Sequence, residues 1–274
     1  ANSFLKGEKI MKKFLTVALA GVLAASMLFT GCSKKAESKV PDKLIVGTNA
    51  EFPPFEYMND KKQPEGFDIA MIKEIGKRMG KKVEIKNMEF KSLIGAMESD
   101  SINAIIAGMT KTEKREKAVD FSDSYYTTNQ AIILKKDSKI TKLAQLDGKK
   151  IGVQEGTTGD LISSGDKFGD GKKAKVLVKG AKVKRFKKGV DAVMDLKNGS
   201  VDAVVIDELT ANEFVKKNAK KLKIVIDSAG SEYYCIALTK GNTAYKEEVN
   251  KQIKAIKEDG TYDKLKAKYI DSKN

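Results

Sequence analysis

Histidine and tryptophan are absent from this 274-residue sequence, and only two of its residues are cysteine. Histidine is the commonest general base near neutral pH, and zinc sites are usually built from cysteine and histidine, so the sequence argues against both chemistries. It also contains no G-x-S-x-G nucleophile elbow and no phosphate-binding P-loop. We therefore expect no catalytic residues, no metal site and no cofactor.

Acidic residues are in the minority, with 37 Asp+Glu against 52 Lys+Arg and a formal net charge of +15. Such a charge can attract nucleic acid. However, the lysines are scattered among acidic residues, and aromatic residues make up only 7% of the chain. A solvated, lysine-rich surface explains this composition better, so we expect no nucleic-acid partner. The same surface suits a location near anionic lipid.

The longest apolar run lies near the N-terminus. It spans residues 14–29, follows two lysines and ends shortly before Cys32. This pattern is typical of a secretory signal peptide, and the run is shorter than the roughly 20 residues of a comfortable membrane span. An uncleaved anchor helix is the alternative. The stretch LFTGC at 28–32 resembles a bacterial lipoprotein processing box, with Phe29 where leucine is commoner. The resemblance implies that Cys32 is lipidated and anchors the protein to the outer face of the cell membrane.

Two short segments flank the signal peptide. Residues 1–10 fit no signal-peptide pattern, and we expect translation to start at Met11. Residues 1–31 are therefore interpreted as a non-native or misassigned start plus the signal peptide. Residues 32–41 are polar and lysine-rich, which predicts a lipidated flexible tether. Lipidation leaves Cys235 without a disulfide partner, so stability must come from an ordinary core.

Beyond the tether, short β-branched runs alternate with longer helical stretches. KLIVGT at 43–48 and KVEIKN at 82–87 have the composition of strands, whereas GFDIAMIKEIGKRMG at 66–80 has that of a helix. Isoleucines at positions 69, 72 and 75 fall on one face of that helix, which predicts a core-facing side. This alternation is typical of an α/β fold.

A helix, turn and strand pattern occurs twice, at 93–108 and at 190–207. Aligning the copies places Asn103 on Asp202 and Gly108 on Asp207. Open α/β sheets bind ligands beyond the carboxyl ends of their strands, so two copies imply two sheets with facing edges. A chance similarity between two generic elements is the alternative.

Two strand-like segments are candidates for crossings between the sheets. They are YYTTNQAIILKK at 125–136 and EYYCIALTK at 232–240, and each has tyrosines before an apolar run. Two crossings would divide the chain into a discontinuous lobe 1 and a continuous lobe 2. The expected boundaries are 42–126 and 232–274 for lobe 1, and 127–231 for lobe 2.

Several short motifs occur in an order that resembles the polar-amino-acid solute-binding proteins of ABC importers. Each motif is weak alone, but the ordered combination is specific and covers nearly all of the chain after the tether. The motifs are GTNAEFPPFEY (47–57), GFDIAMIKEI (66–75), INAIIAGMTKTEKR (102–115), VDFSDSYY (119–126), GKKIGVQEGTTG (148–159), VDAVVIDE (201–208) and DGTYDKLKAKY (259–269). The resemblance implies a two-lobed periplasmic-binding-protein type II fold, in which two α/β domains are joined by two hinge strands with a ligand cleft between them.

Arg115 is the residue expected to anchor the ligand. Thr110 and Glu113 have the spacing of a capping box, which predicts a helix that begins near Lys111 with free backbone N–H groups. A guanidinium in its first turn adds a planar fork of donors that suits a carboxylate. In the family, the matching arginine grips the α-carboxylate of the amino acid. Without the resemblance, an exposed charge within TEKREK is the simpler interpretation.

The resemblance assigns the rest of the amino-acid head group to both lobes. Gly108, which lets the backbone approach closely, and Thr110, with its hydroxyl, match family positions that contact it. Thr158 follows a turn that opens a helix and offers donors to the carboxylate, although a simple helix cap is equally compatible. Asp207 matches the aspartate that receives the α-ammonium group, because a buried cation needs a partner.

Four further positions are expected around the side chain of the ligand. Phe52 and Phe90 match aromatic residues that sandwich it, although both are also compatible with the core. Gln154 matches a position that reaches toward it. Asn49 stands where many relatives that bind basic amino acids or glutamine carry an aspartate.

The expected function is that of the extracytoplasmic substrate-binding component of an amino-acid ABC importer, a monomer that delivers a polar L-amino acid to the permease transmembrane subunits. Closure by rotation at the two hinge crossings is expected. Glutamine is the leading ligand and arginine the second, since a cationic side chain would need Glu51 or Glu56 as its partner. A cyclohexadienyl dehydratase-like enzyme on the same fold and a ligand-sensing receptor domain are the alternatives. The first needs a poised acid or base, and the second a signalling segment.

Overall fold

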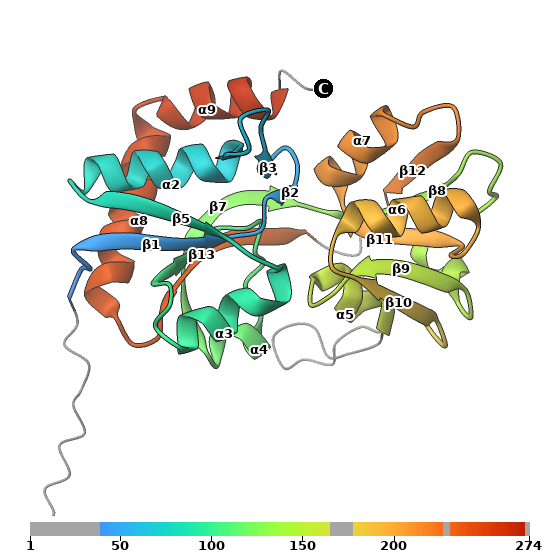
Figure 1. Cartoon of the computed structure of the whole chain (residues 1–274), viewed down its shortest axis with the longest axis horizontal. Helices are drawn as coiled ribbons and strands as arrows, with labels where there is room; N and C mark the ends of the chain where they lie inside the picture. Colours follow the sequence, from blue (N-terminus) through green and yellow to red (C-terminus); the bar gives the residue numbers. More distant parts are fainter. Residues whose placement is uncertain (1–38, 165–177, 227–230, 272–274) are drawn as a thin grey trace, which may run out of the picture. The chain divides into compact units, whose positions relative to one another are not determined.

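The computed structural model describes residues 39–164, 178–226 and 231–271, all of which belong to one compact unit of the chain (Figure 1). The predictions for residues 1–31 and for lipidation at Cys32 lie outside these ranges, as does most of the tether. Within the described ranges, no helix combines the length and apolar character needed to cross a bilayer.

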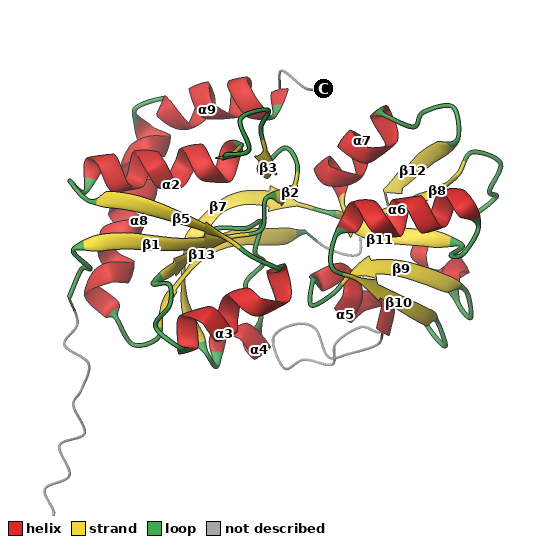
Figure 2. Ribbon diagram, in the orientation of Figure 1, coloured by secondary structure: helices red, strands yellow, loops and turns green. Residues whose placement is uncertain are grey.

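Two five-stranded mixed sheets form the framework (Figure 2). The first has the order β5 (Lys82–Asn87), β1 (Lys43–Thr48), β6 (Ala104–Ile105), β13 (Glu232–Thr239) and β7 (Val119–Thr128). The second has the order β10 (Lys182–Phe186), β9 (Lys150–Gln154), β11 (Ala203–Asp207), β8 (Gln130–Lys135) and β12 (Leu222–Ile226). We use lobe 1 for the elements on the first sheet and lobe 2 for those on the second. The predicted two-lobed α/β fold is thereby confirmed.

Helices cover both faces of each sheet (Figure 1). On lobe 1, one face carries α2 (Phe67–Arg78), α8 (Thr243–Glu258) and α9 (Thr261–Tyr269), and the other carries η1 (Phe90–Ser92), α3 (Leu93–Glu98) and α4 (Glu113–Glu116). On lobe 2, α6 (Gly189–Asn198) and α7 (Glu208–Lys216) lie on one face, and η2 (Leu143–Leu146) and α5 (Thr158–Ser164) contribute to the other. Lobe 1 also includes the small sheet of β2 (Glu51–Phe52), β3 (Glu56–Met58) and β4 (Pro64–Glu65).

The predicted helix at 66–80 corresponds to α2. Its three isoleucines, Ile69, Ile72 and Ile75, are all buried, as their helical spacing predicts. The helix ends just before Gly80, which has a φ of 65° that an L side chain rarely adopts.

The internal repeat has a structural counterpart. In both sheets, the first two neighbour pairs are parallel and the last two are antiparallel. The aligned residues Asn103 and Asp202 also make equivalent hydrogen bonds. The Asn103 side chain accepts a hydrogen bond from the backbone N–H of Ile45 at 2.9 Å, and that of Asp202 accepts one from the N–H of Lys150 at 2.8 Å. Each therefore holds the start of the neighbouring strand, which favours a true repeat over a chance similarity.

The first crossing differs from the single long strand predicted at 125–136. The chain forms β7 in the first sheet, breaks at Asn129, and continues as β8 in the second. β7 reaches Thr128, two residues beyond the expected lobe boundary at 126. The second link joins β12 to β13 and includes residues outside the described ranges. The exact lobe boundaries stay a prediction.

Candidate ligand-binding site

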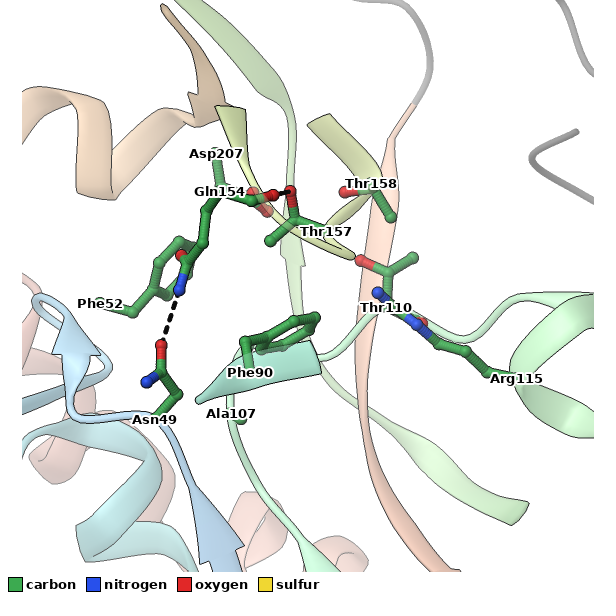
Figure 3. Close-up of a pocket in the computed structure, with 11 residues that line it drawn as sticks. Asn49, Phe52, Phe90, Ala107, Thr110, Arg115, Gln154, Thr157, Thr158 and Asp207 are labelled. Carbon is green, nitrogen blue, oxygen red and sulfur yellow. Dashed lines mark hydrogen bonds between the residues drawn. The ribbon is translucent and has the colours of Figure 1, made fainter. Parts of the chain in front are cut away.

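A small, nearly closed cavity, with about 10 Å³ of room for the centre of a water-sized sphere, lies between the lobes (Figure 3). Its lining residues come from both lobes and lie at the carboxyl ends of strands or on the segments that follow them. They are Asn49, Phe52, Phe90, Ala107, Gly108, Thr110 and Arg115 from lobe 1, and Gln154, Thr157, Thr158 and Asp207 from lobe 2. The structure thus brings together all nine residues predicted for ligand binding. Their roles in binding stay predictions.

Arg115 is buried, with 6% of its surface exposed, and its guanidinium bridges the lobes. Nη1 donates to the backbone carbonyl of Thr110 at 2.5 Å, and Nη2 donates to that of Gly156 in lobe 2 at 3.0 Å. The guanidinium carbon lies 5.3 Å from the ring centre of Phe90. Burial lowers the pKa of Arg115 to about 10, although Glu232 and Asp207 oppose this shift. The group therefore remains a cation at neutral pH.

The start of α4 differs from the predicted capping box at Thr110. The N-cap is Thr112, whose Oγ1 accepts from the backbone N–H of Arg115 at 3.2 Å. The Thr110 hydroxyl instead donates to Glu232. Because α4 has only four residues, we assign the anchoring potential of this region to the Arg115 guanidinium and not to a helix end.

A neighbouring threonine, Thr157, holds the start of α5. Its Oγ1 accepts from the backbone N–H of Asp160 at 3.3 Å. Thr158 is the first residue of the helix, and its hydroxyl donates to Glu232 at 2.8 Å and accepts from Gln130. The alternative that Thr158 is a simple helix cap is therefore wrong.

Asp207 ends β11 and faces the cavity from lobe 2. Its carboxylate accepts from Gln130 Nε2 at 2.9 Å and from the Tyr234 hydroxyl at 2.5 Å. Burial raises the pKa of Asp207, while these two hydrogen bonds and the charge of Arg115 lower it. A buried carboxylate and a buried guanidinium thus belong to the same site.

Glu232 is a site residue that sequence reasoning missed. It begins β13 with 4% of its surface exposed, and one of its oxygens accepts from both Thr110 and Thr158. Burial, helped by the nearby charge of Asp207, raises the pKa of Glu232 to about 7, although the two threonine hydrogen bonds and the charge of Arg115 oppose the shift. The only sign of Glu232 in the sequence is a single acidic residue at the start of the predicted second crossing, before its apolar part. A charge at the end of a strand normally indicates an exposed position.

Two side-chain amides meet across the lobes at the other end of the cavity. Gln154 Nε2 donates to Asn49 Oδ1 at 2.8 Å, a bond that Figure 3 shows as a dashed line, and Asn49 Nδ2 donates to the carbonyl of Met88 at 2.8 Å. Neither glutamate suggested as a partner for a cationic ligand lines the cavity. Glu51 pairs with Lys188 instead.

The other glutamate, Glu56, is fully buried beside Asp68, and both carboxyls lie away from the cavity lining. Asp68 Oδ2 accepts from the backbone N–H of Gly108 at 2.8 Å and from the Tyr125 hydroxyl at 2.6 Å. Burial raises the pKa of Asp68 to about 6 and that of Glu56 well above its usual range. Asp68 thus holds Gly108 at φ 52°, where a Cβ would lie 2.8 Å from a ring carbon of Phe52.

Three ion pairs join the lobes beside the cavity. They connect Lys188 to Glu51 at 2.7 Å, Lys187 to Glu89 at 2.7 Å, and Lys91 to Glu155 at 2.9 Å. Each pair has one partner in lobe 1 and the other in lobe 2. We call these three pairs the rim pairs. Because their side chains are partly exposed, each pair alone contributes little to the free energy of the closed arrangement.

Comparison with known proteins gives consistent results. The family described as bacterial extracellular solute-binding proteins, family 3, matches residues 44–272. The arginine-binding extracellular protein ArtP of Bacillus subtilis (strain 168) is 33% identical over 263 residues, which cover 95% of this chain and 98% of ArtP. The structure of an ancestral arginine-binding protein bound to arginine has a TM-score of 0.75 and 42% identity, over 85% of this chain and 100% of that one. The ancestral protein bound to glutamine gives the same TM-score and identity, over 85% and 99%.

Raising the pH from 5 to 8 should destabilise the protein in the absence of added ligand, in part through Glu232. The pKa of this residue is about 7 in the folded protein, against an ordinary value of 4.5. Between these values the folded protein keeps a proton that the unfolded chain has lost, so stability falls as pH rises toward 7. The shift corresponds to on the order of 3 kcal/mol. We expect Glu232→Gln to flatten the pH dependence of the urea unfolding midpoint.

Asp68 should contribute in the same direction, and its contribution remains in both proteins, so the difference between them reports Glu232 together with its neighbour Asp207. Glu208→Gln is the matched control, because Glu208 is half-buried and lies outside the cavity lining. Identical pH dependence in wild type and Glu232→Gln would show that Glu232 does not titrate in this range.

Proposed function

Because the chain belongs to the bacterial extracellular solute-binding proteins, family 3, we propose that it is the extracytoplasmic substrate-binding component of an amino-acid ABC importer. It binds one polar L-amino acid between its lobes and delivers it to the transmembrane permease subunits. The names of its relatives, which include an arginine-binding extracellular protein and an ancestral protein bound to glutamine, support this assignment.

The observation that carries the proposal is the guanidinium of Arg115. It lines the cavity and donates to two backbone carbonyls, but within the described part of the chain no carboxylate lies at ion-pair distance from it. A buried cation of this kind favours an anionic ligand group. Asp207 supplies a carboxylate in the same cavity. Together the two residues match a zwitterion, with the α-carboxylate on Arg115 and the α-ammonium group on Asp207.

The amide pair favours a neutral, hydrogen-bonding side chain on the ligand. Asn49 and Gln154 each carry both a donor and an acceptor, so they complement the amide of glutamine. The guanidinium of arginine can donate to the same amide oxygens. The ammonium of lysine is a compact charge that needs a carboxylate, and the part of the lining formed by these amides offers none. Glutamine is therefore the first candidate and arginine the second.

The proposal includes the arrangement of the whole chain. The expected lobe boundaries are 42–126 with 232–274 and 127–231, with the first boundary moved to Thr128 because β7 extends that far in the first sheet, and the lobes close by rotation at the two crossings. Lipidated Cys32 anchors the protein to the outer face of the cell membrane. A dehydratase-like enzyme is less supported, because the relatives reported above are named as binding proteins. In addition, the buried acid with a pKa of about 7, Glu232, is not part of the cavity lining.

L-Glutamine and L-arginine should each raise the melting temperature of the protein, because a ligand that binds only the folded state stabilises it by mass action. L-Lysine should produce a much smaller shift at the same concentration. Thermal-shift measurements with the common amino acids, followed by calorimetric titration, check this. No shift with any amino acid, or turnover of prephenate or arogenate, would contradict the proposed function.

Arg115→Ala should weaken amino-acid binding at least about 100-fold, since truncating one partner of a buried charge pair leaves the other unpaired. Arg115→Lys keeps the charge but loses the planar fork, and we expect an intermediate loss. Arg78→Ala is the matched control, because Arg78 pairs with Glu74 and Asp259 away from the cavity. Titration calorimetry on variants with native circular dichroism gives the affinities. Affinity within twofold of wild type in Arg115→Ala would exclude the carboxylate anchor.

Breaking a rim pair should accelerate ligand release, because these pairs form only when the lobes are closed. We expect Lys188→Ala to raise the dissociation rate roughly 1.5- to 5-fold, within the range for exposed pairs, and added salt to reduce the difference from wild type. Lys184→Ala is the control, since Lys184 pairs with Asp195 inside lobe 2. Stopped-flow measurements with glutamine at low and high salt provide the rates. Equal rates in the two variants would show that the rim pairs do not stabilise closure.

A further inference from the structure

Glu232 begins β13, next to the second link between the lobes, and contacts side chains from both of them. Its Oε2 accepts from Thr110 Oγ1 and from Thr158 Oγ1, each at 2.8 Å. Thr110 belongs to lobe 1 and Thr158 to lobe 2, and both line the cavity, whereas Glu232 does not. Any influence of Glu232 on a ligand must therefore act through these two hydroxyls.

The hydrogen bonds determine where the hydroxyl protons point. A carboxylate oxygen only accepts, and each threonine hydroxyl has one proton and two lone pairs. Donation to Glu232 uses the single proton of both Thr110 and Thr158. Thr158 Oγ1 also accepts from Gln130 Nε2 at 3.1 Å, and the same nitrogen donates to Asp207 Oδ1 at 2.9 Å. Toward the cavity, the two hydroxyls can thus offer lone pairs but no protons.

We propose that Glu232 is a positioning residue that sets the hydroxyls of Thr110 and Thr158 as hydrogen-bond acceptors, one from each lobe, for the α-ammonium group of the ligand. With Asp207 they form an acceptor-only corner of the closed site, and the α-carboxylate is left to Arg115. Because the two hydroxyls come from different lobes, the corner is complete only when the lobes are closed. This inference rests on the proposed function and adds a residue to it.

The charges around Glu232 are consistent with this role. The charged groups that face it are Asp207, which raises its pKa, and Arg115, which lowers it, while burial is the largest influence. Two carboxyl groups close together make the corner attractive to a cation. The protonated carboxyl also keeps an acceptor oxygen, so protonation of Glu232 leaves the hydroxyls oriented as acceptors.

The test measures how strongly the protein prefers an amino acid over the same molecule without its amino group. The probes are L-glutamine with 4-carbamoylbutanoate, and L-arginine with 5-guanidinopentanoate. The wild type should prefer the amino acid at least about 100-fold, because a site built to accept N–H bonds is left unsatisfied by the analogue. Glu232→Met fills a similar space with only a weak acceptor, its thioether sulfur, and so frees the hydroxyls to rotate. We expect it to reduce the preference at least about tenfold.

Glu232→Gln keeps an acceptor oxygen in the same place, so its preference should stay within about threefold of the wild type. Glu208→Met is the matched control, because the Glu208 carboxylate accepts from Asn129 Nδ2 at 3.1 Å outside the cavity lining. It should leave the preference unchanged.

The outcomes separate this inference from the proposed function. Equal loss of affinity for the amino acid and its analogue in Glu232→Met would indicate a packing role and overturn the inference. If that variant does not fold, Glu232→Gln decides, because loss of the preference in a variant that retains the acceptor would also overturn it. A wild type that binds no amino acid would overturn the proposed function, and the inference with it.

Discussion

The closed arrangement depends on a guanidinium that is buried between two lobes and held by one backbone carbonyl from each. Removing Arg115 from water costs several kcal/mol, and the two carbonyls recover only part of that hydration. The same loss of hydration lowers the pKa of Arg115 to about 10. Asp207 balances the charge within the cavity without direct contact at ion-pair distance. The site therefore has separated positive and negative poles, which a zwitterion can join.

The two sheets bring these poles together because they repeat one pairing pattern. In each sheet the repeated strand ends at the cavity, with Gly108 following β6 and Asp207 ending β11. Asn103 and Asp202 hold the equivalent strand starts on both sides. One supersecondary unit, used twice, thus contributes close backbone approach in one lobe and a carboxylate in the other.

Contacts between the lobes differ in character from one part of the cleft to another. Beside the crossings, hydroxyls from both lobes share the buried carboxylate of Glu232. At the side-chain end, the amides of Asn49 and Gln154 meet, and the partly exposed rim pairs lie beside the cavity. The buried hydrogen bonds of Glu232 are costly to leave unmade, so their geometry must match closely. The partly exposed rim pairs contribute little each, so salt or a substitution there changes the stability of the closed form only slightly. We infer that recognition resides inside the cleft, and that the rim pairs adjust how long it stays closed.

The sequence by itself determined the α/β alternation and the buried face of α2, and these signals are local, because they rest on periodicity and short spacings. The nine predicted residues around the cavity came instead from the resemblance of the ordered motifs to a known family. Tertiary structure alone decided the partners of Glu232, which lies 122 and 74 positions from its two threonines. It also decided that Thr112 caps α4, since Thr110 is turned toward that distant carboxylate. Spacing along a chain cannot show which of two similar hydroxyls has a better partner elsewhere, and only the folded arrangement brings that partner within reach.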